Sequence, residues 1–409
     1  MQLGVEEQLA YLTKGCVDVV PAEELKAKLE RSIATGTPLT IKVGFDPSAP
    51  DLHLGHTVVI RKMHHFQQLG HKVVFLIGDF TGLIGDPTGK KTTRPQLTEM
   101  EIRANAATYE RQIYKLLDAE KTVIDFNSRW LGKLGSADWI RLAAKVTVAQ
   151  MLERDDFKKR YEAQQPISLH EFLYPLAQGY DSVVLEVDVE IGGTDQLFNL
   201  LVGRHLMRED GQEPQVVMTL PLLEGLDGVE KMSKSLGNYV AVEDVPFEMF
   251  GKLMSISDEL MWKYWLLLSD RSETEIEADR ERVAAGELHP MDVKKQLART
   301  IVAEFHSAEE AEAAQREFER VFSARNLPQD IPDVELVLEG PTILLSKALV
   351  QAGLASSNSE ARRLITQGGV KVEGEPVRDI KATIEVSGST QTLVKVGKRK
   401  FARLRFRIS

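Results

Sequence analysis

Two short motifs carry residue types suited to phosphate chemistry. The first is Lys231-Met232-Ser233-Lys234-Ser235, which has Gly225 and Gly228 before it and Gly237 after it. Lysine is a compact cation on a flexible stem, so it suits negative charge that appears as a phosphate group departs. The flanking glycines indicate a mobile loop. A short run of lysine and serine on its own is more often a solvated loop.

The second motif is His53-Leu54-Gly55-His56, about 180 residues upstream, at the expected start of a helix over residues 56–69. Gly55 lets a nucleotide approach the backbone closely, and a helix N-terminus favours phosphate. The imidazoles can donate hydrogen bonds to phosphate oxygens as charge builds. Histidines that only cap a surface helix are the alternative.

A glycine-rich segment, residues 78–90, follows the second expected strand. Its glycines leave space for a ligand, and Asp86 could accept a substrate ammonium group. Lys90 and Arg94 add positive charge at its end. The glycine spacing does not match a P-loop.

Two further segments place polar groups where a ligand could bind. Tyr174, Gln178 and Asp181 share one face of an apolar helix, at spacings of four and three residues. An ordinary half-exposed helix would show the same pattern. Residues 192–196, Gly-Gly-Thr-Asp-Gln, lie at a strand end, where α/β sheets bind ligands, and Asp195 is suited to ribose hydroxyls.

Short apolar runs alternate with helical patterns over residues 1–222, which is typical of an α/β domain with a parallel, Rossmann-like sheet. The expected strands are residues 39–44, 72–78, 121–126, 183–191 and 215–220. Residues 90–166 are too long for one crossover and predict a helical insertion.

The remaining chain predicts two more domains. Residues 223–325 contain the lysine motif and a wholly helical region, in which Pro290 opens a helix with one apolar stripe. Two prolines and acidic residues predict a linker over residues 326–340. Residues 341–409 predict a small α+β domain with two helices, two short strands around a glycine turn and further strands.

Charge is unevenly distributed. The whole chain has a net charge of −10, yet residues 341–409 contain 13 Lys+Arg and 5 Asp+Glu, a net of +8. A basic module on an acidic body can approach nucleic-acid phosphates, although a basic tail kept for solubility is the alternative.

No apolar run approaches the roughly 18–20 residues of a membrane span, the N-terminus lacks a signal-like stretch, and one cysteine excludes an internal disulfide. We expect a cytoplasmic protein without a membrane partner.

With these motifs in order, the chain resembles the bacterial tyrosyl-tRNA synthetases, which are class I enzymes. The Gly-Phe-Asp-Pro loop at residues 44–47, the Tyr174 helix, the Asp195 segment and the two phosphate motifs all match. Residues 357–365 and 368–370 match the S-four-like RNA-binding domain of that family. The resemblance implies tyrosine activation by ATP and transfer of tyrosine to tRNA(Tyr), first to the 2′-hydroxyl. It also implies a homodimer, Mg²⁺ entering with ATP, and no permanently bound cofactor or protein metal site.

The resemblance also implies roles for individual residues. The catalytic set is His53, His56, Lys90, Arg94, Lys231 and Lys234. The ATP-binding set is Ser48, Gly55, Gly193, Asp195 and Lys234. The tyrosine-binding set is Gly44, Asp46, Thr81, Asp86, Tyr174, Gln178, Asp181 and Gln196, in which Asp181 takes the phenolic hydroxyl and Asp86, Tyr174 and Gln178 bind the amino group. The RNA-binding set is Arg362, Arg363 and Lys371.

One residue departs from the family pattern. Lys42 stands where many members have a tyrosine that makes a second contact to the substrate phenol. Lys42 could replace it as a donor, or point away and leave recognition to Asp181. This departure indicates a second bacterial branch of the family. A tryptophanyl-type synthetase and a non-catalytic, synthetase-derived RNA-binding protein remain the alternatives.

Overall fold

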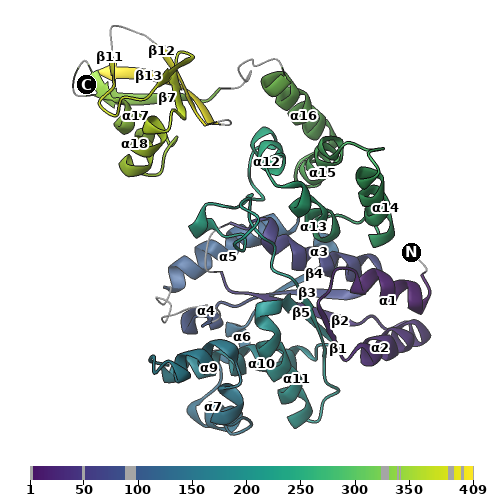
Figure 1. The fold of residues 1–409 in the computed structure, drawn as a ribbon. Helices are drawn as coiled ribbons and strands as arrows, with labels where there is room; N and C mark the ends of the chain where they lie inside the picture. Colours follow the sequence, from purple (N-terminus) through teal and green to yellow (C-terminus); the bar gives the residue numbers. More distant parts are fainter. Residues whose placement is uncertain are drawn as a thin grey trace. The chain divides into compact units, whose positions relative to one another are not determined.

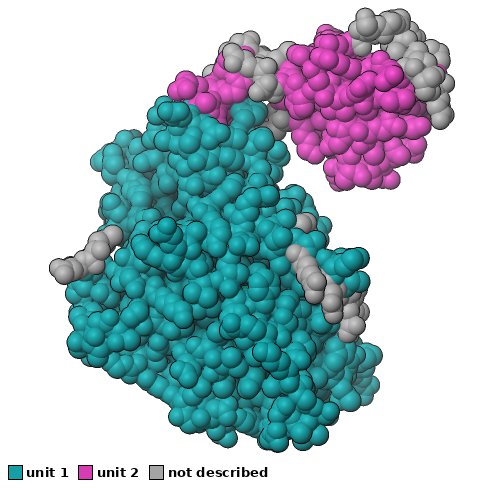
Figure 2. Space-filling model, turned by 180° about the vertical axis from the view of Figure 1, so that it is seen from behind, with its two compact units in different colours: residues 1–312 teal, residues 313–409 magenta. Residues whose placement is uncertain are grey.

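The computed structural model describes residues 3–47, 51–87, 98–323, 331–338, 340, 342–385, 391–397 and 400–408. The chain divides into two compact units, residues 1–312 and residues 313–409 (Figure 2). Among the described residues, no helix combines the length and the apolar character that crossing a membrane requires.

Unit 1 is built on a six-stranded sheet in the order β1-β6-β5-β2-β3-β4. Its strands are β1 (Asp18–Val20), β2 (Thr40–Phe45), β3 (Lys72–Ile77), β4 (Thr122–Phe126), β5 (Val189–Gly193) and β6 (Val216–Leu220). Strands β2 to β6 run parallel, as predicted, and β1, which was not predicted, pairs antiparallel with β6. The carboxyl ends of the parallel strands therefore meet along one edge.

Helices lie on both faces of this sheet, with α3 on one face and α10 and α11 on the other (Figure 1). The α-helices up to β6 are α1 (Val5–Thr13), α2 (Ala22–Thr35), α3 (Leu54–Gln68), α4 (Thr81–Ile84), α5 (Glu99–Ile113), α6 (Ser128–Leu131), α7 (Ser136–Ala143), α8 (Val148–Met151), α9 (Asp155–Glu162), α10 (Leu173–Leu185) and α11 (Leu197–Glu209). The short 3-10 helices of unit 1 are η1 (Ala119–Lys121), η2 (Leu169–Phe172), η3 (Thr194–Gln196) and η4 (Lys234–Leu236).

One sequence prediction in unit 1 was inaccurate. The strand expected over residues 183–191 begins only at Val189, because residues 183–185 complete α10. The segment expected to carry a helical insertion, residues 90–166, includes α5 and α6 to α9. Between them lies β4, which is the strand predicted over residues 121–126 and an edge strand of the main sheet.

The region after β6 is helical, as predicted. It contains α12 (Pro246–Leu253), α13 (Asp258–Leu268), α14 (Glu273–Ala284), α15 (Pro290–Phe305) and α16 (Ala308–Ser323). Helix α15 begins at Pro290, whose missing N–H would have no intrahelical partner. Its predicted stripe of Val293, Leu297, Ile301 and Phe305 is buried.

Unit 2 combines a five-stranded sheet, ordered β10-β9-β12-β13-β7, with a two-stranded sheet of β8 and β11. Its elements after α16 are β7 (Asp333–Leu338), β8 (Thr342–Leu344), α17 (Leu345–Gln351), α18 (Asn358–Thr366), β9 (Val370–Val372), β10 (Glu375–Val377), β11 (Thr383–Glu385), β12 (Gln391–Val396) and β13 (Lys400–Ile408). The predicted small α+β domain is present.

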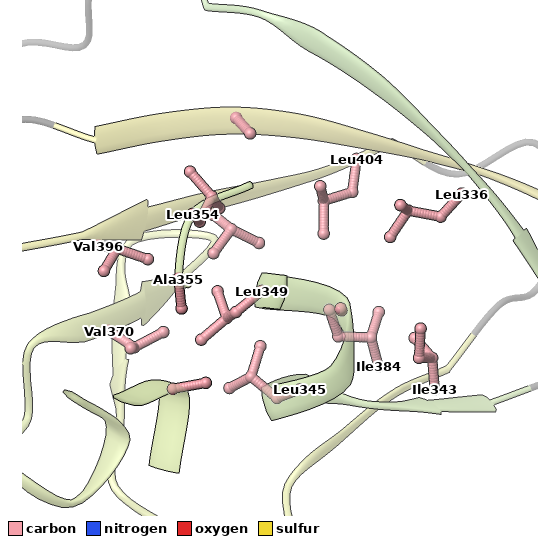
Figure 3. Packing of buried hydrophobic residues seen from close by; sticks show 14 of the residues in the cluster. Leu336, Ile343, Leu345, Leu349, Leu354, Ala355, Val370, Ile384, Val396 and Leu404 are labelled. Atoms are coloured by element: carbon pink, nitrogen blue, oxygen red, sulfur yellow. The ribbon is translucent and has the colours of Figure 1, made fainter. Parts of the chain in front are cut away.

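Strand β7 corrects the predicted linker over residues 326–340. It pairs in parallel with β13 over six residues, from Asp333 opposite Arg403 to Leu338 opposite Ile408. Leu336 joins the buried cluster around Leu349 of α17 and Leu404 of β13 (Figure 3). The segment after Pro332 is therefore a structural part of unit 2.

Candidate active site

A cleft of about 650 Å³ in unit 1 opens where β2, β3, β5 and β6 end. Ligands bind at this edge in parallel α/β sheets because loops diverge there and leave space. The predicted residues that line the cleft are Gly44, Asp46, His53, Gly55, His56, Thr81, Asp86, Tyr174, Gln178, Asp181, Gly193, Asp195, Gln196, Lys231 and Lys234. Ser48, Lys90 and Arg94 lie outside the described residues.

The two motif histidines stack at the start of α3, with ring centroids 3.9 Å apart. His53 is the N-cap of the helix, and its Nδ1 accepts a hydrogen bond from the backbone N–H of Gly55 at 3.2 Å. The Nδ1 atom of His56 accepts one from the backbone N–H of His53, also at 3.2 Å. Because both Nδ1 atoms are acceptors, both neutral rings carry their proton on Nε2. Each ring therefore keeps one N–H for a ligand.

Burial keeps these imidazoles uncharged. Burial, followed by the nearby His56 and Lys234, lowers the pKa of His53 to about 2. Burial, followed by the charges of Lys234 and Lys231, lowers the pKa of His56 to about 4. At neutral pH the pair therefore acts through N–H dipoles, and the lysines supply the positive charge.

The two motif lysines face acidic residues across the cleft. Lys234 Nζ lies 2.9 Å from Asp51 Oδ2, and Lys231 Nζ lies 3.8 Å from Asp195 Oδ2. The Lys231 side chain is 54% exposed. An ion pair as exposed and as long as that of Lys231 is weak, so this ammonium group can turn toward a polyanion.

The lysine loop has a defined fold around Asn238. The Asn238 side chain accepts from the Ser233 N–H at 2.8 Å and donates to Asp227 at 2.7 Å. A Cβ on Gly225 would lie 2.3 Å from the same amide, so this position requires glycine. Gly237 has a φ of +67°, which L side chains rarely adopt. Backbone geometry thus accounts for these loop glycines.

Asp181 lies at the buried floor of the cleft, on α10. Its carboxylate accepts from Trp130 Nε1 at 2.7 Å and from Asn127 Nδ2 at 3.2 Å. Burial raises the pKa of Asp181 to about 7, against the lowering effects of Lys42 and of these two hydrogen bonds. The carboxylate is a buried acceptor whose orientation these two hydrogen bonds fix.

A second buried network joins Asp46, Thr81 and Tyr174. Thr81 Oγ1 donates to Asp46 Oδ1 at 2.6 Å, and Tyr174 Oη donates to Asp46 Oδ2 at 2.8 Å. A Cβ on Gly78 would lie 2.1 Å from Asp46 Oδ1. The side chain of Asp46 thus occupies the space that the absent Cβ leaves.

Asp86 lies at the wall of the cleft and is paired. Its carboxylate accepts from Gln196 Nε2 at 2.9 Å and from the buried Arg154 at 3.2 Å. Arg154 also contacts Asp156 at 2.8 Å. The Asp86 carboxylate is therefore already oriented and partly neutralised before any ammonium group arrives.

Lys42 is fully buried and points into a polar network. Its Nζ lies 2.8 Å from Glu190 Oε1, 3.0 Å from Ser182 Oγ and 3.4 Å from the carbonyl of Gln178. These contacts use the three N–H donors of an ammonium group. Of the two predicted alternatives for Lys42, this geometry favours the one in which it leaves phenol recognition to Asp181.

Several residues of the site were missed from the sequence: Asn127, Trp130, Arg154, Ser182 and Glu190. Each is a single polar or aromatic residue without a local motif. Asn127 alone had a usable signal, because it follows β4 at the carboxyl edge of the sheet.

In unit 2, the three predicted RNA-binding residues are exposed. Arg362 and Arg363 lie on α18, and Lys371 lies on β9. The exposed position suits phosphate contacts.

Comparison with known proteins identifies the family. A family model described as tRNA synthetases class I (W and Y) matches residues 34–323, and one described as the Tyrosine–tRNA ligase SYY-like C-terminal domain matches residues 324–404. A Tyrosine–tRNA ligase of Moorella thermoacetica is 58% identical over 98% of this chain and 96% of its own length. One of Geobacter sulfurreducens is 55% identical over 99% of this chain and 100% of its own length. The chain belongs to the tyrosine–tRNA ligase family.

The predicted class I synthetase, with tyrosine rather than tryptophan as its amino acid, is therefore confirmed. Solved structures of tyrosine–tRNA ligases share the fold. A C-terminally truncated mitochondrial tyrosyl-tRNA synthetase of Aspergillus nidulans matches with a TM-score of 0.64 at 22% identity, covering 78% of this chain and 95% of its own. A tyrosyl-tRNA synthetase of Archaeoglobus fulgidus, complexed with L-tyrosine, matches with a TM-score of 0.61 at 23% identity. The match covers 76% of this chain and 100% of that one.

Proposed function

We propose that the cleft of unit 1 performs tyrosine activation with a buried end that selects the phenol and an open end that handles the phosphates. The observation that carries this proposal is the directed, buried carboxylate of Asp181 at the floor. A phenolic O–H that enters the floor would give this carboxylate a further hydrogen bond beside those from Trp130 and Asn127, whereas a phenyl ring would not. An unsatisfied buried acceptor costs about 1–3 kcal/mol.

The amino group of tyrosine would lie among Asp86, Tyr174 and Gln178, with Asp46 and Thr81 holding Tyr174 in place. The tyrosine carboxylate then attacks the α-phosphorus of ATP, and the bond to the β-phosphate oxygen breaks. The N–H groups of His53 and His56 and the ammonium groups of Lys231 and Lys234 would meet the charge that develops on pyrophosphate. Asp195 and Gly193 would contact the ribose, and the undescribed Ser48, Lys90 and Arg94 keep their proposed phosphate roles.

Mg²⁺ would enter with ATP. Among the described residues, no group of three or more potential metal ligands is present. Mg²⁺ in nucleotide sites needs only one or two carboxylates in addition to phosphates and water, and Asp195 and Asp51 line the cleft. The residues present are compatible with a metal held mainly by the triphosphate.

Transfer to tRNA(Tyr) would follow in the same cleft, with the terminal adenosine accepting tyrosine first on its 2′-hydroxyl. Arg362, Arg363 and Lys371 would contact tRNA phosphates. Because both substrates of this reaction, ATP and tRNA, are found in the cytoplasm, we also propose a cytoplasmic location.

A homodimer is proposed from the surface of residues 136–172. Four successive elements there expose large apolar side chains: Ile140 at 70%, Val148 at 67%, Tyr161 at 66% and Leu169 at 84%. Light scattering should give twice the chain mass of 45.8 kDa, and Leu169→Asp should shift the protein toward monomer. Val17→Asp, at an exposed valine outside this segment, is the control. A monomeric wild-type protein at micromolar concentration would refute the dimer.

The activity itself is tested by ATP–pyrophosphate exchange with each of the standard amino acids. L-Tyrosine should drive exchange far better than any other. Exchange driven best by tryptophan, or by none of them, would contradict the proposed reaction.

A further inference from the structure

At the floor of the cleft lies a fully buried ion pair to which the proposed reaction steps assign no role. Lys42 on β2 and Glu190 on β5 are directly opposite in the parallel register, so both side chains emerge on the same face. Their relative exposures are 0% and 1%, and Nζ lies 2.8 Å from Oε1. Buried ion pairs contribute little net stability compared with apolar residues of the same volume. Stability alone therefore does not explain why this pair lies under the substrate pocket.

The polar groups around Glu190 all donate to it. Its Oε1 faces Lys42, and its Oε2 accepts from Ser182 Oγ at 3.0 Å and from Gln215 Nε2. This surrounding set of donors matches an ionised carboxylate, which can only accept hydrogen bonds. Lys42 supplies the positive charge that this buried carboxylate faces.

The carboxylate of Glu190 determines the orientation of the neighbouring Gln178 amide. Gln178 Nε2 lies 3.5 Å from Glu190 Oε1, which is a long contact. The reverse orientation would place two acceptor oxygens against each other. The amide oxygen is therefore directed away from Glu190. Gln178 lines the cleft, and no described residue donates a hydrogen bond to its buried Oε1.

We infer that Glu190, paired with Lys42, is a positioning residue that directs the amide oxygen of Gln178 toward the α-ammonium group of the bound amino acid. The inference rests on the proposed role of Gln178 in ammonium binding. With the amide reversed, its NH₂ group would face the ammonium and repel it. Because its side chain is only 1% exposed, Glu190 would act through Gln178 rather than on the substrate directly.

The test compares two inhibitors of tyrosine-dependent exchange that differ only in the ammonium group: L-tyrosinol and 3-(4-hydroxyphenyl)propan-1-ol. In the full-length Glu190→Gln variant, the neighbour of Gln178 can donate as well as accept, so the amide loses its fixed orientation. We expect the inhibition constant of tyrosinol to rise about tenfold, equivalent to about 1.4 kcal/mol. The constant of the desamino alcohol should change less than twofold. The KM for tyrosine should rise, with kcat little changed.

A double-mutant cycle separates positioning from general damage. In a Gln178→Ala background, Glu190→Gln should have no further effect on the ratio of the two inhibition constants. Lys42→Met leaves a buried unpaired carboxylate and can fail to fold, so Lys42→Met/Glu190→Gln is the second variant, with the same selective loss expected. Lys294→Met is the matched control, because Lys294 is a buried lysine of α15 bound to Asp258 and the carbonyl of Ile256.

The outcomes distinguish the positioning role of Glu190 from the proposed ammonium site at Gln178. If Gln178→Ala lowers the preference for tyrosinol but Glu190→Gln does not, the positioning role is wrong and the proposed ammonium site stands. If Gln178→Ala itself leaves the preference unchanged, the ammonium site is wrong. Equal weakening of both inhibitors by Glu190→Gln would also overturn the inference, because it would indicate a disturbed pocket rather than a reoriented amide.

Discussion

At the scale of single residues, the cleft combines side chains that are charged at neutral pH with side chains whose charge depends on burial. Lys231 and Lys234 are cations at the cleft mouth, whereas burial keeps His53 and His56 neutral. Asp181 lies between these cases, because burial raises its pKa to about 7 while Lys42, Trp130 and Asn127 oppose that rise. In the proposed mechanism, selectivity for the phenol depends on this one carboxylate, whose protonation changes near neutral pH.

Removal of this carboxylate should weaken the discrimination between tyrosine and phenylalanine. Asp181→Ala leaves the phenolic O–H without its acceptor but leaves the ring contacts in place. A hydrogen bond to a charged group contributes about 1.5–3 kcal/mol, so the ratio of kcat/KM for the two amino acids should fall at least tenfold. Competitive exchange assays measure this ratio. Unchanged selectivity would place the determinant elsewhere.

The raised pKa of Asp181 predicts a pH profile. As the pH rises from 6 to 8, Asp181 loses its proton and becomes a charged acceptor, which forms the stronger hydrogen bond. The kcat/KM for tyrosine should rise through about pH 7, and the value for phenylalanine should not. Because the folded state holds this proton more tightly than the unfolded state, the stabilising contribution of protonated Asp181 should be lost as the pH rises from about 4 to about 7 and should stay lost above pH 7. Asp181→Asn should abolish both effects, and persistence of the profile in that variant would assign it to another group.

The motif residues were predictable because their chemistry is local. Residue type and spacing predict phosphate contacts for two pairs, His53 with His56 and Lys231 with Lys234. All four residues line the cleft. Glu190, Arg154 and Trp130 were not predictable. Their importance arises from contacts across the sheet and between helices, and a single buried polar residue carries no such information in its local sequence.

At the scale of elements, the sequence predicted the parallel strands well and their limits less well. The apolar run over residues 183–191 predicts one strand, but a continuous apolar run does not distinguish a buried strand from the end of a buried helix. β7 was missed because Pro332 and the adjacent acidic residues are typical of a linker. Only its partner β13, some seventy residues later, makes it a strand.

The lysine loop supports a prediction at this scale. Lys231→Ala and Lys234→Ala should each slow tyrosine-dependent exchange more than tenfold, or about 1.4 kcal/mol of transition-state stabilisation. Both side chains lie at the open end, away from the buried floor, so the KM for tyrosine should hardly change. Measurement of kcat and KM separates these effects. A large loss of tyrosine affinity with normal turnover would show that the loop belongs to the amino-acid site.

Strand β7 supports a second element-scale prediction. A fragment of residues 331–409 should fold cooperatively, whereas residues 341–409 should not. The shorter fragment lacks Leu336 and Leu338 of the buried cluster and leaves β13 unpaired along one edge. Thermal melts followed by circular dichroism compare the two. If both fragments melt with the same midpoint, β7 is dispensable to the fold.

At the scale of the whole molecule, charge is distributed unevenly along the chain. The first 340 residues carry a net charge of −18 and the remainder +8. The cleft residues all belong to unit 1, whereas the exposed basic residues of α18 and β9 belong to unit 2. Adenylate formation should therefore be independent of unit 2, and tRNA binding should depend on it.

A chain that ends at Ser323 tests this division. It removes β7 with the rest of the C-terminal domain, which a cut at residue 340 would not do. The shortened protein should retain tyrosine-dependent exchange within about twofold and lose most charging at moderate tRNA concentration. Full-length charging should also weaken steeply with added salt, because phosphate contacts release counterions. Charging rates measured against tRNA concentration test whether the basic domain binds tRNA. The Arg362→Ala/Arg363→Ala variant, which keeps the domain but removes two of its basic residues, is compared in the same assay. If the full-length and shortened proteins give coincident curves, the basic domain does not bind tRNA and its charge has another cause.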